Sequence, residues 1–190
     1  LIGGSGLSMG MNSKYLETYS GMNVVNAGVA KSIGIVYTMD NSLRYIRAND
    51  IVILCPEYQN FFGNFAFGNS YLLRTIMDTN IQQILTLRFE QITNILPHVL
   101  YYCVTKLKPS EYLYSDEGRV YDISALNFYG DMCNHWSSEN STQGDANLVT
   151  GDLNVSIFEI VREYGDSINT IGAQLLLAFP AYKRSSYEVS

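Results

Sequence analysis

Leu1-Ile2-Gly3-Gly4-Ser5-Gly6 opens the chain and joins the end of an apolar strand to a glycine turn that carries a serine. Glycines on either side of Ser5 permit backbone angles and close approaches that other residues resist. A hydroxyl on such a turn suits a nucleophile, and it also suits a residue that caps the next helix. Ser5 is therefore the first candidate for a functional residue.

Three later apolar runs, 24–28, 51–56 and 175–180, also stop at Gly or Pro. Runs of this kind are typical of parallel strands covered on both faces. Between them lie stretches with helical spacing, at 37–46 and at 76–89, the second broken near Thr79-Asn80. The alternation predicts an α/β fold of three layers, α/β/α, with a doubly wound, mainly parallel sheet of the flavodoxin-like type. Ligands of such sheets bind beyond the carboxyl ends of the strands, where all the turns would meet.

The 190 residues, 47% of them hydrophobic, suffice for one core, so we expect a single domain over residues 1–190. Residues 109–150 are polar and lack a sustained period, which predicts a surface insertion and a candidate lid. Residue 1 already lies within an expected strand, and Ser185 with Glu188 forms a capping-box pattern just before the last residue. We therefore expect the domain to be truncated at both ends.

Composition argues against several classes of function. The formal net charge is −6, and no basic cluster exceeds Lys183-Arg184, so a nucleic-acid partner is not expected. Three cysteines without C-x-x-C spacing and two histidines favour neither a disulfide framework nor a metal site. No apolar run approaches the ~20 residues of a membrane-spanning helix.

Three segments together resemble the first three sequence blocks of the SGNH (GDSL-type) hydrolases: Ile2 to Leu7, Val25 to Gly28 and Asp50 to Tyr58. The resemblance implies that Ser5 is the catalytic nucleophile and also donates its backbone N–H to the oxyanion hole. It implies that the N–H of Gly28 is a second donor to that hole. The middle of the chain is not matched.

The third block departs from the family pattern. Where the family has an asparagine side chain as the last oxyanion donor, this chain has Pro56-Glu57-Tyr58. An ionised Glu57 cannot donate a hydrogen bond to an oxyanion and would repel it. The Gly-Gly-Ser opening together with Pro-Glu-Tyr resembles a divergent bacterial subgroup of the family. We therefore treat Asn26, Glu57 and Tyr58 as possible contributors to the site.

The catalytic base is the missing part. The family takes it from a late Asp-x-x-His block, which this sequence lacks, so the resemblance places that histidine beyond residue 190. His98 follows Pro97 in an apolar stretch and is expected in the core or at a helix end. Asp131 and His135, four residues apart, are expected to form a surface ion pair.

The resemblance implies a serine esterase or O-acyltransferase that acts on a small acyl ester, with an acylated carbohydrate as one possible substrate and no cofactor. It also suggests the cell envelope or an extracytoplasmic location. Gly4, Gly6 and Gly10 allow a dinucleotide loop, but the second strand ends in Asn26-Ala27-Gly28 and lacks the acidic residue that such sites use for the ribose. The alternative left open is a catalytically degenerate SGNH-fold protein that binds or assembles.

Overall fold

The structure is a computed structural model and describes residues 1–113, 123–136 and 151–180. The expected helix start at Ser185 and Glu188 lies outside these residues, as does much of the segment 109–150. The strands and helices are β1 (Ile2–Gly3), α1 (Ser5–Gly10), α2 (Ser13–Ser20), β2 (Ala27–Gly28), α3 (Ile35–Ser42), β3 (Ile51–Cys55), α4 (Ser70–Thr79), α5 (Phe89–Ile95), α6 (Val99–Lys106), α7 (Ser110–Leu113), α8 (Ser156–Ile171) and β4 (Gln174–Leu177).

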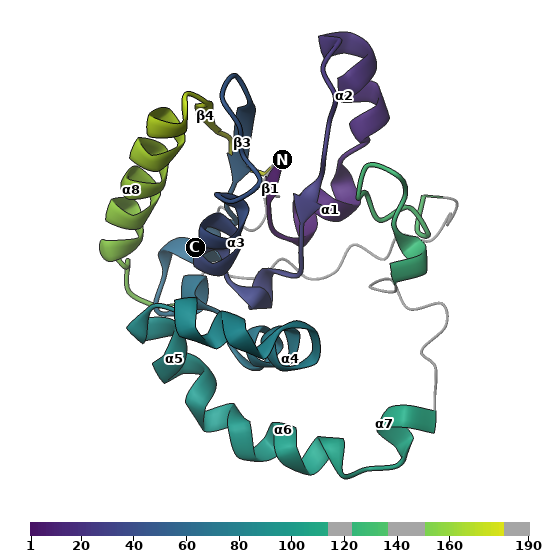
Figure 1. Cartoon of the computed structure of the whole chain (residues 1–190), viewed down its shortest axis with the longest axis vertical. Coiled ribbons are helices and arrows are strands. Elements are labelled where there is room, and N and C mark those ends of the chain that lie inside the picture. The colour runs from purple at the N-terminus through teal and green to yellow at the C-terminus, as the bar shows by residue number, and fades with distance from the viewer. Residues whose placement is uncertain (114–122, 137–150, 181–190) are drawn as a thin grey trace.

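The described strands form one parallel sheet in the order β2-β1-β3-β4 (Figure 1). In β1, Ile2 lies opposite Ala27 of β2 on one side and Leu54 of β3 on the other. Helices flank the sheet, so the predicted α/β class with a parallel sheet is confirmed. Because β1 lies between β2 and β3 and all three are parallel, the segments that follow them lie together at the carboxyl ends of the strands, which we call the sheet edge.

Two of the strands differ from the sequence prediction. Strand β2 is shorter than the predicted run 24–28 and comprises Ala27–Gly28 alone. The N–H of Asn26, just before it, donates to the carbonyl of Tyr129. Strand β4 is an edge strand, and Leu176 and Leu177 are about half exposed. The expectation that every strand is covered on both faces is therefore wrong for β4.

The main core lies between the sheet and helices α3 and α8, which also contact each other. Helix α8 buries Ile157, Ile160, Tyr164 and Ile168, whose three- and four-residue spacing puts them on one face. These side chains pack with residues from α3 and with Val52 and Leu54 of the central strand β3. The core thus fixes β3 and, beside it, the position of β1.

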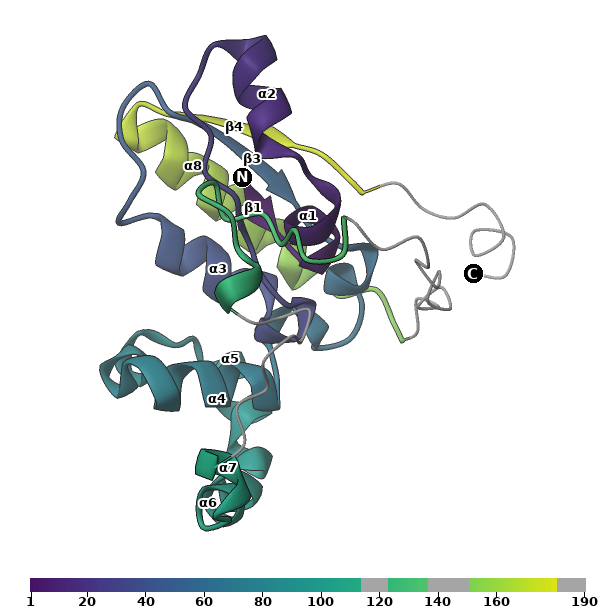
Figure 2. The ribbon, with the colours of Figure 1, turned by 90° about the vertical axis from the view of Figure 1, so that its right-hand side faces the viewer.

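A second cluster of apolar side chains centres on α4, where Leu72, Leu73 and Ile76 pack against Ile95 of α5. The predicted break near Thr79-Asn80 is confirmed, since α4 ends at Thr79 and the side chain of Asn80 accepts a hydrogen bond from the next turn. Residues 89–108, which we call the helical arm, comprise α5, a 3₁₀ turn at Leu96–His98, α6 and the two residues after it. Figures 1 and 2 show α4 and the arm together, away from the strands.

Part of the polar segment 109–150 is described, and its residues 123–136 lie beside α1. Met132 donates its N–H to the carbonyl of Ser8, and Asp131 bonds to Ser13. Ala125, Asp131 and Met132 are buried. This part of the expected surface insertion is therefore anchored to the domain by buried residues.

In the part of the chain that the structure describes, no helix combines the length and the apolar run required to cross a membrane.

Candidate functional site

Ser5 lies at the sheet edge where β1, β2 and β3 end. It is the first residue of α1, directly after β1, and Gly4 is the N-cap. The first N–H groups of a helix have no partner within the helix and carry partial positive charge. The half-buried side chain of Ser5 thus stands beside the first backbone N–H groups of α1.

Glu57 is the residue that the structure brings to Ser5. The Ser5 hydroxyl donates to Oε1 of Glu57 over 3.3 Å, and the N–H of Gly6 donates to the same oxygen over 3.4 Å. Pro56 alone separates Glu57 from the end of β3, and β3 is the neighbour of β1 in the sheet. A carboxylate in contact with a serine hydroxyl is able to take up its proton.

Gly4 makes the space that Glu57 occupies. A Cβ atom at position 4 would collide with Oε1 of Glu57 and would lie 2.7 Å from its Cδ. The backbone of Gly4 has a negative φ angle that any residue adopts, so the requirement for glycine here is one of space. The Gly-Gly-Ser turn therefore admits the carboxylate as well as exposing the serine.

Asn60 is a residue of this site that sequence reasoning missed. Its Oδ1 accepts the N–H of Glu57 over 2.9 Å, and the residue is 2% exposed. The bond fixes the backbone at the point where the carboxylate side chain departs. An asparagine three residues after Glu57, just beyond an apolar strand, is typical of a side chain that closes a short turn. This spacing is the feature of the sequence from which the role of Asn60 could have been predicted.

Gly28 lies against α1, and its N–H already has an acceptor. That N–H donates to Oδ1 of Asn26 over 2.9 Å. A Cβ at position 28 would lie 2.7 Å from the backbone nitrogen of Ser8, so only glycine fits without a shift. An oxyanion would therefore have to compete with Asn26 for this donor.

Asn26 is held in turn by Asp131, which the sequence predicted only as the partner of His135 in a surface ion pair. Oδ1 of Asp131 accepts from the side chains of Asn26 over 2.7 Å and Ser13 over 2.6 Å. Oδ2 accepts the N–H of Ser13 over 2.9 Å and the Asn127 amide over 3.1 Å. Burial of the Asp131 carboxyl raises its pKa, but these hydrogen bonds outweigh that effect and hold the pKa below its ordinary value.

The two histidines lie elsewhere. His98 ends the 3₁₀ turn Leu96–His98, in agreement with the expected helix end. His135 does not pair with Asp131: its Nε2 contacts the carbonyl of Met9 at 3.0 Å, whereas Asp131 is buried in the network above. The surface ion pair is therefore a wrong prediction, because the segment is not helical there and turns Asp131 inward.

Aromatic rings gather beside Glu57. Tyr58 stacks on Phe179, which follows β4, with ring centres 5.6 Å apart. Phe61 contacts both Phe179 and Phe158. Phe158 and Phe179 are each 48% exposed, so this cluster presents apolar ring surface at the same edge of the sheet.

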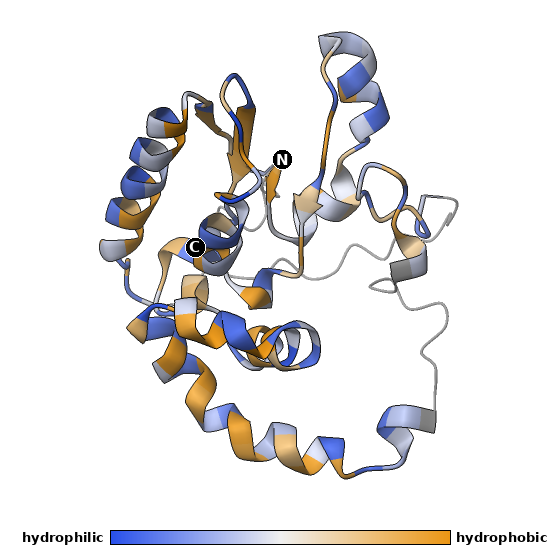
Figure 3. Ribbon diagram, in the orientation of Figure 1, coloured by the Kyte–Doolittle hydropathy of each residue, from blue (hydrophilic) through white to orange (hydrophobic). Residues whose placement is uncertain are grey.

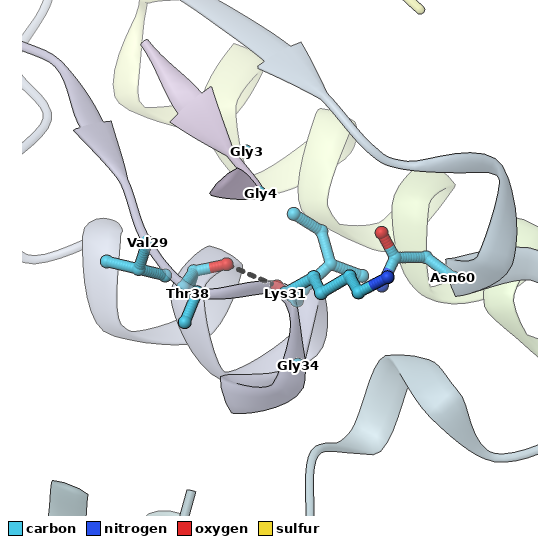
Figure 4. A pocket seen from close by; sticks show the side chains of 9 residues that line it. Gly3, Gly4, Val29, Lys31, Gly34, Thr38 and Asn60 are labelled. Carbon is cyan, nitrogen blue, oxygen red and sulfur yellow. Dashed lines mark hydrogen bonds between the residues drawn. The ribbon is translucent and has the colours of Figure 1, made fainter. Parts of the chain in front are cut away.

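A shallow hollow opens next to the serine turn (Figure 4). It is lined by Gly3 and Gly4 before Ser5, by residues 29–31 after β2, by the start of α3 and by Asn60. The ammonium of Lys31 at this hollow donates to Oε1 of Gln59 over 3.1 Å. The hollow thus has polar groups from the segments that follow three neighbouring strands.

Cys55 ends β3 near the site, and burial raises the pKa of its thiol, an effect that the positive charge of the chain's first amino group opposes. A thiol with a raised pKa is mostly protonated at neutral pH and is a poor nucleophile. Within residues 1–113, 123–136 and 151–180, no three His, Cys, Asp or Glu side chains gather in a way that could hold a metal ion.

Comparison with known protein families, with curated protein sequences and with solved structures gives no match for this chain.

Proposed function

We propose that the chain is a serine hydrolase or O-acyltransferase domain of the SGNH type, with Ser5 as the nucleophile. The observation that carries the proposal is the hydrogen bond from the Ser5 hydroxyl to the Glu57 carboxylate on a glycine turn at the sheet edge. The strand order β2-β1-β3-β4 supports it, because it agrees with the flavodoxin-like order 2-1-3-4 and puts Ser5 where that order reverses direction.

In the proposed reaction, Oγ of Ser5 bonds to the acyl carbon of an ester while the hydroxyl proton passes to Glu57. The carbon–oxygen bond to the leaving alcohol then breaks, and Glu57 returns the proton to that alcohol. Water or a sugar hydroxyl releases the acyl group by the reverse sequence. Glu57 serves here as the base because it contacts the hydroxyl. The histidine that the family resemblance implies is not among residues 1–190.

The developing negative charge would fall near the N-terminus of α1. The Ser5 N–H is the donor that the family resemblance implies, and the helix N-terminus favours an anion. Gly28 would join as the second donor if its N–H turned from Asn26 to the oxyanion. Asp131 keeps the Asn26 amide in one orientation and thus sets how readily Gly28 is released.

A small acyl ester, such as an acetyl group on a carbohydrate, is the proposed substrate. The shallow hollow beside Gly4 leaves little room for a long acyl chain. The exposed rings of Phe158 and Phe179 offer a surface of the kind on which sugars stack.

A second candidate is a binding or assembly protein that keeps the fold without turnover. Two observations favour it: Oε1 of Glu57 occupies the Gly6 N–H, and Asn26 occupies the Gly28 N–H. These two donors are thus satisfied within the chain, which is a stable arrangement for a surface that does not catalyse.

The deciding experiment compares wild type with Ser5→Ala for labelling by a fluorophosphonate and for release of p-nitrophenol from p-nitrophenyl acetate. We expect both signals in wild type and a loss of at least about 1,000-fold in Ser5→Ala. Ser110→Ala is the matched control, because Ser110 also begins a helix but lies at the far side of the arm. Equal labelling of wild type and Ser5→Ala would end the proposal.

Variants of Glu57 separate the two candidates. If Glu57 is the base, Glu57→Ala and Glu57→Asn both lose activity, because neither side chain accepts the proton. If the chain is a degenerate member of the family, wild type is inactive and Glu57→Asn gains activity by restoring an amide donor.

A further inference from the structure

The helical arm carries an apolar face that no described residue covers. Helix α6 has no buried residue, although six of its eight residues are Val, Leu, Tyr or Cys. A helix that is apolar on all sides is normally buried. Figure 3 shows the hydrophobic colouring running along α5 and α6.

The exposed apolar residues form a stripe along the arm. They recur at intervals of three or four residues through α5, the 3₁₀ turn and α6, and are between 39% and 82% exposed. The stripe consists of Phe89, Ile92, Leu96, Leu100, Val104 and Leu107. The opposite side of the arm, with Ile95, Val99 and Tyr102, packs against α4. The arm is thus anchored on one side and open on the other.

We propose that the stripe is a two-fold interface with a second copy of this chain, in which two arms pair antiparallel. A two-fold interface must be complementary to itself, so that residue i meets residue j and j meets i. The stripe satisfies this condition about a centre at His98. Phe89 and Leu107 lie equally far from the centre, as do Ile92 and Val104, and Leu96 and Leu100.

The charges at the ends of the stripe also fit this pairing. The exposed Glu90 lies one residue inside the start, and the exposed Lys108 lies one residue beyond the end. Antiparallel pairing brings the acidic end of one arm to the basic end of the other. Parallel pairing would instead put like charges together. Arg88, also at the start, is already paired with Asp40 and Glu163.

The area of the stripe is close to what a stable dimer needs. With roughly 150 to 200 Å² for a fully exposed large apolar residue, the six residues present about 600 to 800 Å². A stable interface buries about 800 Å² on each partner. The stripe alone supplies most of that area before its polar surroundings are counted. The proposal rests on the arm and does not depend on the chemistry proposed for Ser5.

The first test is sedimentation equilibrium of the full chain. We expect a dimer with a Kd of about 10 µM or tighter. Leu96→Glu/Leu100→Glu places charges at the centre of the interface and should weaken the dimer at least about 100-fold. The control is Phe128→Glu, which introduces one glutamate at an apolar residue that is 97% exposed and outside the arm. Unchanged circular dichroism in all variants would show that folding is intact, and a monomeric wild type would overturn the proposal.

Cross-linking tests the antiparallel geometry. Cys103 is exposed and lies five residues after the centre, and the exposed Thr93 lies five residues before it. In Thr93→Cys, a short bis-maleimide should join position 93 of one copy to Cys103 of the other. Cross-links of 93 to 93 and 103 to 103 would instead indicate a parallel pair and contradict the proposal. Binding of the wild type to phosphatidylglycerol vesicles without dimer formation would assign the stripe to a membrane surface and would also overturn it.

Discussion

The sheet and the helical arm use similar apolar residues in opposite ways. In the sheet, Val52 and Leu54 of β3 are almost fully buried, and α3 and α8 close over them. In the arm, Leu96 and Leu100 are 65% and 80% exposed. Around β3 the core is therefore completed within the chain, whereas the arm is covered on one side only. The comparison teaches that apolar content alone does not tell whether a segment is core or interface.

Truncation of one leucine in each region tests this comparison most strongly. Leu54→Ala removes a side chain with no exposed surface and should lower the free energy of unfolding by about 3 kcal/mol. Leu100→Ala makes the same chemical change at an exposed position and should cost about 0.5 kcal/mol or less in the monomer. Urea unfolding at low protein concentration measures both. Equal losses would mean that the arm side chain is buried within the chain.

Gly4→Ala tests the close packing at the serine turn. The new Cβ requires the Glu57 side chain to swing away from Ser5, so kcat/KM should fall about 100-fold while stability changes little. Gly10→Ala is the matched control, because nothing lies within 4 Å of a Cβ at the other end of the same helix. When Glu57 has already been replaced by Ala, adding Gly4→Ala should cause no further fall in kcat/KM.

Asp131→Asn tests the buried network that joins the polar segment to α2 and β2. The NH₂ group of the new amide would face N–H and O–H donors that the carboxylate now accepts from. We expect the free energy of unfolding to fall by about 2 kcal/mol. Because the pKa of Asp131 is lowered on folding, its contribution is present above the ordinary value of 3.8 and is lost as the pH falls below it. The free energy of unfolding of wild type, measured with urea, should therefore fall more steeply over that pH range than that of the variant. Asp152→Asn, the same change at an exposed aspartate, is the control and should leave the free energy of unfolding near that of wild type.

The smallest effect concerns the ion pairs of Arg88, the N-cap residue of α5, with α3 and α8. Arg88 makes two bonds of 3.0 and 3.1 Å to Asp40 of α3 and one of 3.4 Å to Glu163 of α8. A lysine cannot make the two parallel bonds that the guanidinium makes to Asp40. Arg88→Lys should therefore lower the free energy of unfolding by about 0.5 to 1 kcal/mol, a small effect because the groups are partly exposed. Added salt should reduce the difference from wild type. A difference that persists at high salt would point to packing of the arginine side chain instead.

Much of the fold could be predicted from local pattern. The apolar runs at 51–56 and 175–180 predicted β3 and β4, and the break at Asn80 was visible because asparagine caps helices. Ser5 on its glycine turn was also visible. The apolar residues of the arm gave no sign that half of them are exposed, because the spacing of a buried face and of an interface face is the same.

The candidate site was less predictable, because its contacts link distant residues. Ser5 and Glu57 are 52 residues apart, and Ser13 and Asp131 are 118 apart. The sequence by itself determined a class of fold, its parallel strands and a serine at the end of the first of them, since strand and turn preferences act over a few residues. Only the tertiary structure decided that a carboxylate meets that serine and that an aspartate is buried beneath Asn26. Those contacts depend on which strands lie side by side, and strand order is set by the packing of the whole core.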